Sequence, residues 1–92
     1  MNEITLVYVE DFLERSRKEV QDERVFKVAE RKLSFLKMKG LRYPSLQAKK
    51  LQNLYHGENE LWEFRITKKY RCYFTYSNKT NTITVIKIGN HL

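Results

Sequence analysis

Two arginines and a histidine in the last third of the chain have the side chains needed to cleave RNA without a metal ion. Arg65 and Arg71 flank a short basic segment, and His91 is the penultimate residue. A guanidinium group donates two parallel hydrogen bonds to a phosphate, and an imidazole carries a proton near neutral pH. Such groups could stabilise the crowded phosphate and transfer the protons of a 2′-hydroxyl attack. Arg65, Arg71 and His91 are therefore candidate catalytic residues, although the same side chains could merely bind a polyanion.

Further basic and aromatic residues are candidates for binding the RNA chain. The predicted RNA-binding residues are Lys49, Lys50, Lys68, Lys69, Tyr73 and Lys87. Lysines neutralise flanking phosphates, whereas Tyr73 could stack a base or simply cover the sheet. The alternative is a structural role, in which the arginines pair with Glu63 across neighbouring strands. The residues alone leave both interpretations open.

Positive charge is concentrated in the later part of the chain. Residues 1–31 have a net charge of −2, whereas residues 32–92 have a net charge of +9. A field of this kind is typical of proteins that bind a phosphate backbone. A solvated lysine-rich surface would have the same composition, so the charge supports the RNA hypothesis without deciding it.

Length and composition limit the class of protein. Ninety-two residues, 41% of them hydrophobic, predict a single folded domain over residues 1–92. The lone Cys72 cannot form an internal disulfide, so we expect a buried thiol in a cytoplasmic protein. Two isolated histidines and one cysteine lack the spacing of a metal site, so no metal or other cofactor is expected. No segment approaches the ~20 apolar residues of a membrane span.

Hydrophobic periodicity predicts helices first and strands later. Apolar residues at helical spacing indicate a helix after Asp11 and a second helix over about residues 22–38, which Asp22 can cap and Gly40 can end. From Leu61 onward the period becomes two, and residues 47–54 are ambiguous. We expect an α+β domain with two N-terminal helices packed on one face of a small four-stranded, mainly antiparallel sheet. Its strands are residues 4–8, 61–66, 70–76 and 82–88.

The strand alternation assigns side chains to two faces of this sheet. The face expected to pack against the helices has Trp62, Phe64, Ile66, Tyr70, Cys72, Phe74, Tyr76, Ile86 and Ile88. The opposite face has Leu61, Glu63, Arg65, Arg71, Tyr73, Thr75, Ile83, Val85 and Lys87. The second face would therefore form a cationic floor that contains a tyrosine.

These motifs resemble the RelE/ParE superfamily of bacterial toxin–antitoxin toxins over residues 46–92. The resemblance rests on Leu-Gln-Ala-Lys-Lys-Leu, Leu-Trp-Glu-Phe-Arg-Ile, Tyr-Arg-Cys-Tyr-Phe and Ile-Gly-Asn-His. The segment Arg-Ile-Thr-Lys-Lys-Tyr-Arg is similar to the strand–turn–strand of YoeB-like toxins, whose catalytic arginine falls on Arg71 and whose terminal histidine falls on His91. Lys49 and Lys50 lie where RelE is rich in active-site lysines.

The resemblance implies a metal-independent endoribonuclease that cuts mRNA on the ribosome and is blocked by a cognate acidic antitoxin. YoeB-like toxins place a glutamate, their general base, before the three-strand meander, but this chain has no carboxylate between Arg31 and Glu58. Two alternatives remain, a ParE-like inhibitor of DNA gyrase and an inactive relative that only binds its antitoxin or RNA. The combination of Arg71 with His91 favours the nuclease.

Overall fold

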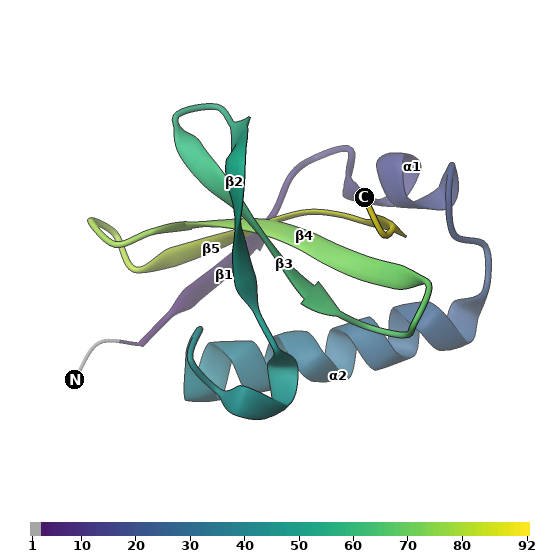
Figure 1. Ribbon diagram of the computed structural model, residues 1–92, viewed down its shortest axis with the longest axis horizontal. Coiled ribbons are helices and arrows are strands. Elements are labelled where there is room, and N and C mark those ends of the chain that lie inside the picture. Colours follow the sequence, from purple (N-terminus) through teal and green to yellow (C-terminus); the bar gives the residue numbers. More distant parts are fainter. Residues whose placement is uncertain (1–2) are drawn as a thin grey trace.

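The computed structural model describes residues 3–92, which form a mixed sheet with helices at its face and edge (Figure 1). The elements in chain order are β1 (Thr5–Tyr8), α1 (Phe12–Arg17), α2 (Glu23–Lys39), the 3-10 helix η1 (Pro44–Leu46), β2 (Lys49–His56), β3 (Asn59–Arg65), β4 (Tyr70–Ser77) and β5 (Thr82–Asn90).

The sheet has five strands in the order β1-β5-β4-β3-β2. β1 pairs with β5 in parallel, and the other three pairs are antiparallel. The α+β class and the mainly antiparallel sheet are confirmed, but the expected number of four strands is wrong because β2 adds an edge strand. Most β2 side chains are exposed, and a register shift between Lys50 and Tyr55 accompanies a positive φ at Asn53. The segment therefore lacks the alternation that marks a half-buried strand.

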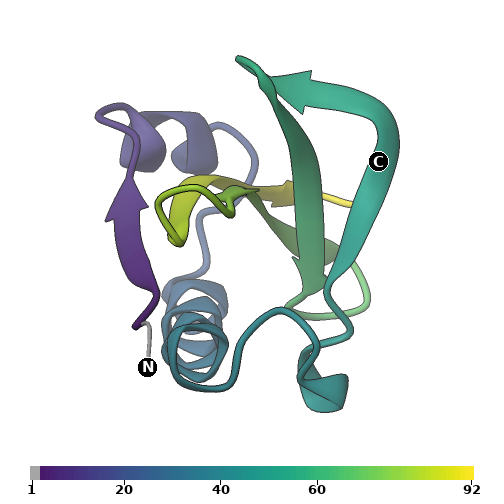
Figure 2. The same cartoon turned by 90° about the vertical axis from the view of Figure 1, so that its left-hand side faces the viewer.

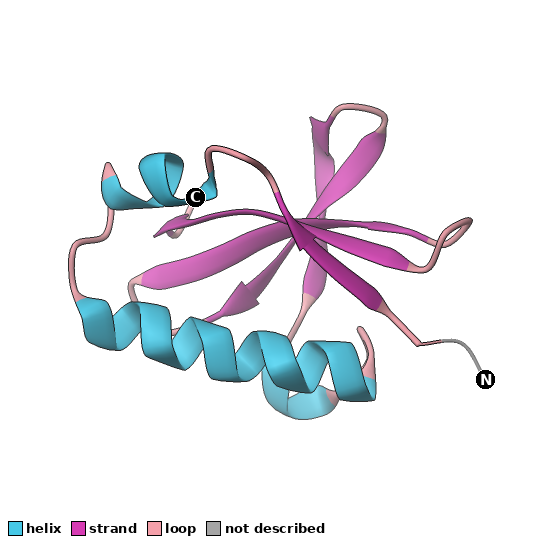
Figure 3. Ribbon diagram, turned by 180° about the vertical axis from the view of Figure 1, so that it is seen from behind, coloured by secondary structure: helices cyan, strands magenta, loops and turns pink. Residues whose placement is uncertain are grey.

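Helix α2 follows the predicted boundaries closely and lies across one face of the sheet (Figure 3). The Asp22 carboxylate accepts a hydrogen bond from the backbone N–H of Arg24, and Gly40 ends the helix with a φ of 88°. The buried stripe of the helix is Val25, Ala29, Leu33 and Leu36. Among residues 3–92, no helix is long and apolar enough to cross a membrane.

Helix α1 and the turn after it complete the edge of β5. β1 pairs with β5 only as far as Val85, which leaves later backbone N–H groups of β5 without a strand partner. Ser16 Oγ accepts from the N–H of Ile88 at 2.9 Å, and Glu19 Oε1 accepts from the N–H of Asn90 at 3.0 Å. Side chains thus replace the missing strand and fix the C-terminal end of the sheet.

A β-bulge in β5 changes which of its residues face α2. Tyr73 pairs with Lys87 but Phe74 pairs with Val85, so Ile86 is an extra residue without a partner. The simple alternation therefore fails across Ile86, and Ile83 and Val85 lie in the core instead of on the cationic face. The buried core comprises Val20, Val25, Ala29, Leu33, Leu36, Leu46, Phe64, Ile66, Cys72, Phe74, Ile83, Val85 and Ile88. The buried Cys72 agrees with the sequence prediction, and burial raises the pKa of its thiol.

Candidate active site

The strand register gathers five of the nine predicted site residues in two rows on the sheet face turned away from α2, which we call the site face. One row crosses four strands as Lys49, Glu63, Tyr73 and Lys87. The next row crosses three strands as Arg65, Arg71 and Gly89. Figure 2 shows α1 on one side of this face and the β2–β3 hairpin on the other. Residues distant in sequence therefore meet on one basic face of the sheet.

Arg71 is held in place by the turn between β3 and β4. One terminal nitrogen, Nη1, donates to the carbonyl oxygens of Thr67 at 2.7 Å, Tyr70 at 3.1 Å and Lys68 at 3.3 Å. The Thr67 hydroxyl in turn accepts from the N–H of Tyr70 at 3.1 Å and tightens the turn. The Arg71 side chain is 11% exposed. Fixing one end of the guanidinium leaves Nη2 pre-oriented for an anion above the sheet.

Arg65 lies directly opposite Arg71 on the neighbouring strand and is exposed. The Lys32 ammonium of α2 donates to the Arg65 carbonyl oxygen at 2.7 Å, which ties this end of β3 to the helix. Directly opposed like charges destabilise a strand pair, so the two arginines together favour a bound anion. Lys68 and Lys69 are exposed in the adjoining turn, and the Lys69 ammonium lies 5.2 Å from the centre of the Tyr70 ring.

His91 lies just beyond β5, beside the β3–β4 turn. Its backbone N–H donates to the Lys69 carbonyl oxygen at 3.0 Å, and its side chain is exposed. The preceding residue, Asn90, accepts a hydrogen bond from the Tyr73 hydroxyl at 2.5 Å and is bound by Glu19. The chain end is therefore anchored through its backbone, while the imidazole is exposed to solvent.

Tyr73 cannot stack a base, because its side chain is 1% exposed. Burial raises the pKa of its hydroxyl, and the nearby Glu63 carboxylate raises it further. The hydroxyl therefore stays protonated and donates to the Asn90 carbonyl. The stacking interpretation is wrong, and the covering interpretation fits the structure.

The predicted lysines are not all on the site face. Lys49 pairs with Glu63 and lies on the site face, but Lys50 pairs in register with Trp62 on the α2 side. The Lys50 ammonium is 3.4 Å from a Glu60 carboxylate oxygen. Lys87 is on the site face, although its ammonium contacts Glu19 at 2.5 Å. Lys50 is therefore removed from the candidate RNA surface, because neighbouring strand residues point to opposite faces.

Glu63 is the site residue that the sequence analysis treated only as a possible structural partner. Its side chain is 3% exposed, and its Oε2 lies 3.7 Å from Arg71 Nε and 3.7 Å from Lys49 Nζ. The expected Arg–Glu63 contact is therefore present, but at a separation beyond hydrogen-bond length. The sequence did contain a signal for this role. Glu63 is two residues before Arg65 in a strand, so both side chains lie on the cationic face.

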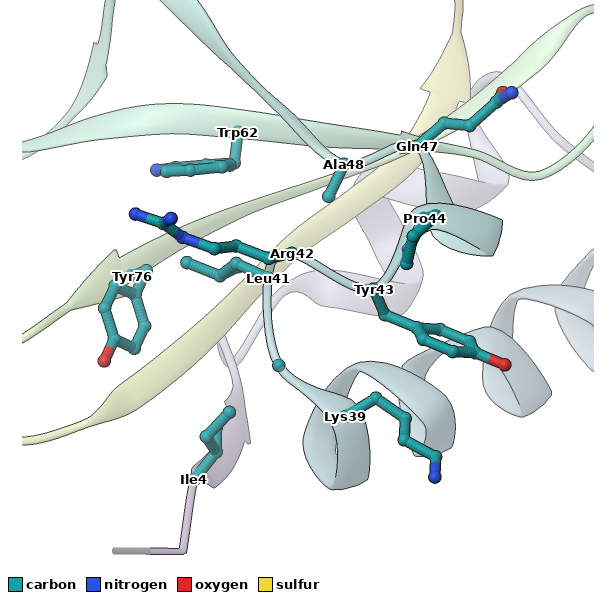
Figure 4. Close-up of a pocket in the computed structure, with 11 residues that line it drawn as sticks. Ile4, Lys39, Leu41, Arg42, Tyr43, Pro44, Gln47, Ala48, Trp62 and Tyr76 are labelled. Atoms are coloured by element: carbon teal, nitrogen blue, oxygen red, sulfur yellow. The ribbon is translucent and has the colours of Figure 1, made fainter.

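A separate hollow of about 670 Å³ lies on the α2 side of the sheet (Figure 4). Trp62 and Tyr76 line it from the sheet, and Leu41 and Arg42 line it from the segment after α2. These strand residues face away from Arg71, so this hollow is not part of the site face.

Solved structures match this architecture over nearly the whole chain, although no protein-family model and no curated protein matches the sequence. The YoeB dimer from Staphylococcus aureus gives a TM-score of 0.71 at 16% identity, covering 99% of this chain and 100% of that chain. The archaeal RelE–RelB complex from Pyrococcus horikoshii gives a TM-score of 0.71 at 12% identity, covering 97% of this chain and 96% of that chain. YafQ from E. coli gives a TM-score of 0.64 at 13% identity, covering 97% of this chain and 94% of that chain.

The protein has a RelE-like fold. The motifs that resemble this family lie in residues 46–92, whereas the likeness in fold extends through the N-terminal half as well. At these identities the likeness gives the arrangement of the backbone. The chemistry has to be argued from the side chains that this chain places on it.

Proposed function

We propose that the protein is the toxin of a toxin–antitoxin pair and cleaves mRNA on the ribosome in the cytoplasm. The observation that carries this proposal is the pairing of Arg65 with Arg71 on the site face, with Arg71 held by three carbonyl oxygens. Two adjacent cations, one of them pre-oriented, would stabilise the negative charge that accumulates on an RNA phosphate under attack. The RelE-like fold adds support, because the sequence motifs of this surface resemble those of ribosome-dependent nucleases.

In the proposed reaction a ribose 2′-oxygen attacks the adjacent phosphorus atom without a metal ion. Arg71 and Arg65 stabilise the negative charge that accumulates on the non-bridging oxygens. His91 transfers a proton, and Lys49, Lys68 and Lys69 bind flanking phosphates. The bond to the 5′-oxygen breaks, which leaves a 2′,3′-cyclic phosphate or, after hydrolysis, a 3′-phosphate.

The proposed inhibitor is a cognate acidic antitoxin. The archaeal structure with this fold is a RelE–RelB complex, and another is the RelBE2 toxin–antitoxin complex of Mycobacterium tuberculosis. The net charge of +9 over residues 32–92 would attract an acidic, partly disordered segment. Such a segment would fold as it covers the site face and would compete with RNA for the same cations.

Single-turnover cleavage of a defined mRNA on purified ribosomes tests the nuclease. Arg71→Ala should lower the cleavage rate by about 10²–10³ while changing ribosome binding little, because its charge acts mainly in the transition state. Arg42→Ala is the matched control, since Arg42 lies in the hollow on the α2 side. The site assignment is wrong if Arg71→Ala and His91→Gln both cut at the wild-type rate. If the wild-type protein cuts no mRNA but inhibits gyrase, the ParE-like alternative holds instead.

A further inference from the structure

We propose that Glu63 is the general base that removes the proton from the attacking 2′-hydroxyl. This inference rests on the proposed function and identifies a base for a chain that lacks the glutamate of YoeB-like toxins. Glu63 comes from β3 rather than from the segment before the meander. It lies in the row next to Arg65 and Arg71, on the same face.

The surroundings of Glu63 are unusual for a carboxylate that only stabilises the fold. Burying a carboxylate costs several kcal/mol unless charge and hydrogen bonds compensate. Within residues 3–92, the Glu63 carboxylate forms two ion pairs at 3.7 Å, to Lys49 and Arg71, and no hydrogen bond. It therefore carries the cost of burial while its oxygens remain free to accept a hydrogen bond from a ligand. Buried groups with incomplete pairing of this kind concentrate at functional sites.

The groups around Glu63 also suit proton abstraction next to a phosphate. Lys49 approaches from β2 and Arg71 from β4, while the buried Tyr73 ring closes the side towards Lys87. A phosphate held by Arg71 would place the adjacent ribose close to the carboxylate, since Arg71 Nε and Glu63 Oε2 are already 3.7 Å apart. Among the described residues, Glu63 is the carboxylate that contacts Arg71.

In the proposed step, Glu63 accepts the proton as the 2′-oxygen forms a bond to phosphorus, and the bond from phosphorus to the 5′-oxygen breaks. The 5′-oxygen leaves with the electron pair and takes a proton from the His91 imidazolium. The products are a 2′,3′-cyclic phosphate and a 5′-hydroxyl, with Glu63 protonated and His91 neutral. Exchange of protons with water then restores both groups.

A purely positioning role for Glu63 makes a different prediction. If the carboxylate only oriented Arg71, its loss would lower the cleavage rate by the same factor at every pH, because the carboxylate would transfer no proton. If it is the base, Glu63→Gln removes the dependence of the rate on deprotonation of this carboxylate. The groups that face it and could contribute to the pH profile are Lys49, Arg71 and Tyr73, with His91 at the chain end.

The test is the single-turnover rate of mRNA cleavage on ribosomes as a function of pH for the wild type, Glu63→Gln and Glu63→Ala. Glu63→Gln should cut about 10²–10⁴ times more slowly and lose the acidic limb of the profile, with ribosome affinity changed by only a few fold. Added formate should partly restore cleavage by Glu63→Ala, since a small carboxylate can occupy the vacated space. Glu60→Gln is the matched control, because Glu60 is on the same strand but pairs with Lys50.

Three results would overturn the inference. Cleavage by Glu63→Gln within a few fold of the wild type would exclude a base at this position. A slow Glu63→Gln that keeps the wild-type pH profile, together with a Glu63→Ala that formate does not restore, would assign Glu63 to positioning alone. In both cases a wild-type protein that cuts and an Arg71→Ala variant that does not would leave the proposed function intact. A wild type that cuts no mRNA would remove the proposed function and this inference together.

Discussion

At the scale of single residues, Glu19 links the connector after α1 to the end of β5. Its carboxylate accepts hydrogen bonds from the Asn90 backbone N–H at 3.0 Å and side chain at 3.2 Å, and from Lys87 at 2.5 Å. Gly89 gives it the room to do so, because a Cβ at this position would lie 2.8 Å from Glu19 Oε2. One carboxylate therefore holds the strand end that carries His91.

Replacing Glu19 with alanine should destabilise the fold by about 1–3 kcal/mol, since a partly buried, charged hydrogen-bond acceptor is lost. The free energy of unfolding from urea titrations measures this loss. Glu14→Ala is the control, because Glu14 is exposed on α1 and has no ion pair among residues 3–92. Equal stability of Glu19→Ala and the wild type would contradict the anchoring role.

The same interaction predicts a pH dependence of stability. Burial alone would raise the pKa of Glu19, but hydrogen bonds from Lys87 and Asn90 outweigh burial and lower it. A lowered folded pKa means that Glu19 stabilises the fold above its unfolded pKa of about 4.3 and loses this contribution as the pH falls through the folded value. The stability difference between wild type and Glu19→Ala should therefore be full at neutral pH and shrink below about pH 4.

At the scale of elements, the end of α2 depends on one backbone conformation. Gly40 has φ 88° and ψ 176°, a region open almost only to glycine, and its N–H donates to the Leu36 carbonyl oxygen. This conformation directs the chain from α2 into η1 and then into the edge strand β2. The arrangement of β2 relative to the site face therefore starts at this glycine.

Gly40→Ala should lower the free energy of unfolding by about 1–3 kcal/mol through backbone strain alone. A Cβ at Gly40 would meet no atom within 4 Å, so a clash cannot explain the loss. Gly57→Asn in the β2–β3 turn is the comparison, because its φ of 65° is one that asparagine tolerates. Thermal or urea unfolding of both variants measures the difference. A Gly40→Ala variant as stable as Gly57→Asn would show that the strain is relieved elsewhere.

At the scale of the whole molecule, the two faces of the sheet differ in charge. The site face has Arg65, Arg71 and Lys49, whereas the opposite face is covered by α2 and its apolar stripe. The adjacent residues Lys49 and Lys50 of β2 point to opposite faces of the sheet. A polyanion that approaches the site face would thus meet only one of them.

Lys49→Ala should weaken binding of single-stranded RNA and reduce the slope of log affinity against log salt by about 0.7, the value for one phosphate contact. Lys50→Ala should leave both quantities nearly unchanged. The two lysine side chains are similarly exposed, at 64% and 50%, so the comparison tests position rather than charge. Fluorescence anisotropy of a labelled RNA at several salt concentrations gives both values. Equal effects of the two substitutions would mean that RNA binding is not confined to the site face.

The sequence by itself determined the helices, the three-strand meander and the pairing of Arg65 with Arg71. These features follow from local periodicity, helix caps and a short turn, which act over neighbouring residues. Residue order also placed Cys72 and Phe74 on the core face correctly, because no irregularity interrupts β4 before them.

Only the tertiary structure decided the fifth strand, the core positions of Ile83 and Val85, and the place of Glu63. β2 is an irregular edge strand, so its formation depends on pairing with β3 rather than on its own pattern. The extra residue at the Ile86 bulge breaks the alternation in β5, so Ile83 and Val85 before it lie in the core, while Lys87 and Ile88 after it keep their predicted faces. Glu63 became a candidate site residue because it contacts Lys49 on one neighbouring strand and Arg71 on the other. Contacts between separate strands, which no local pattern encodes, therefore made a buried carboxylate part of a cationic site.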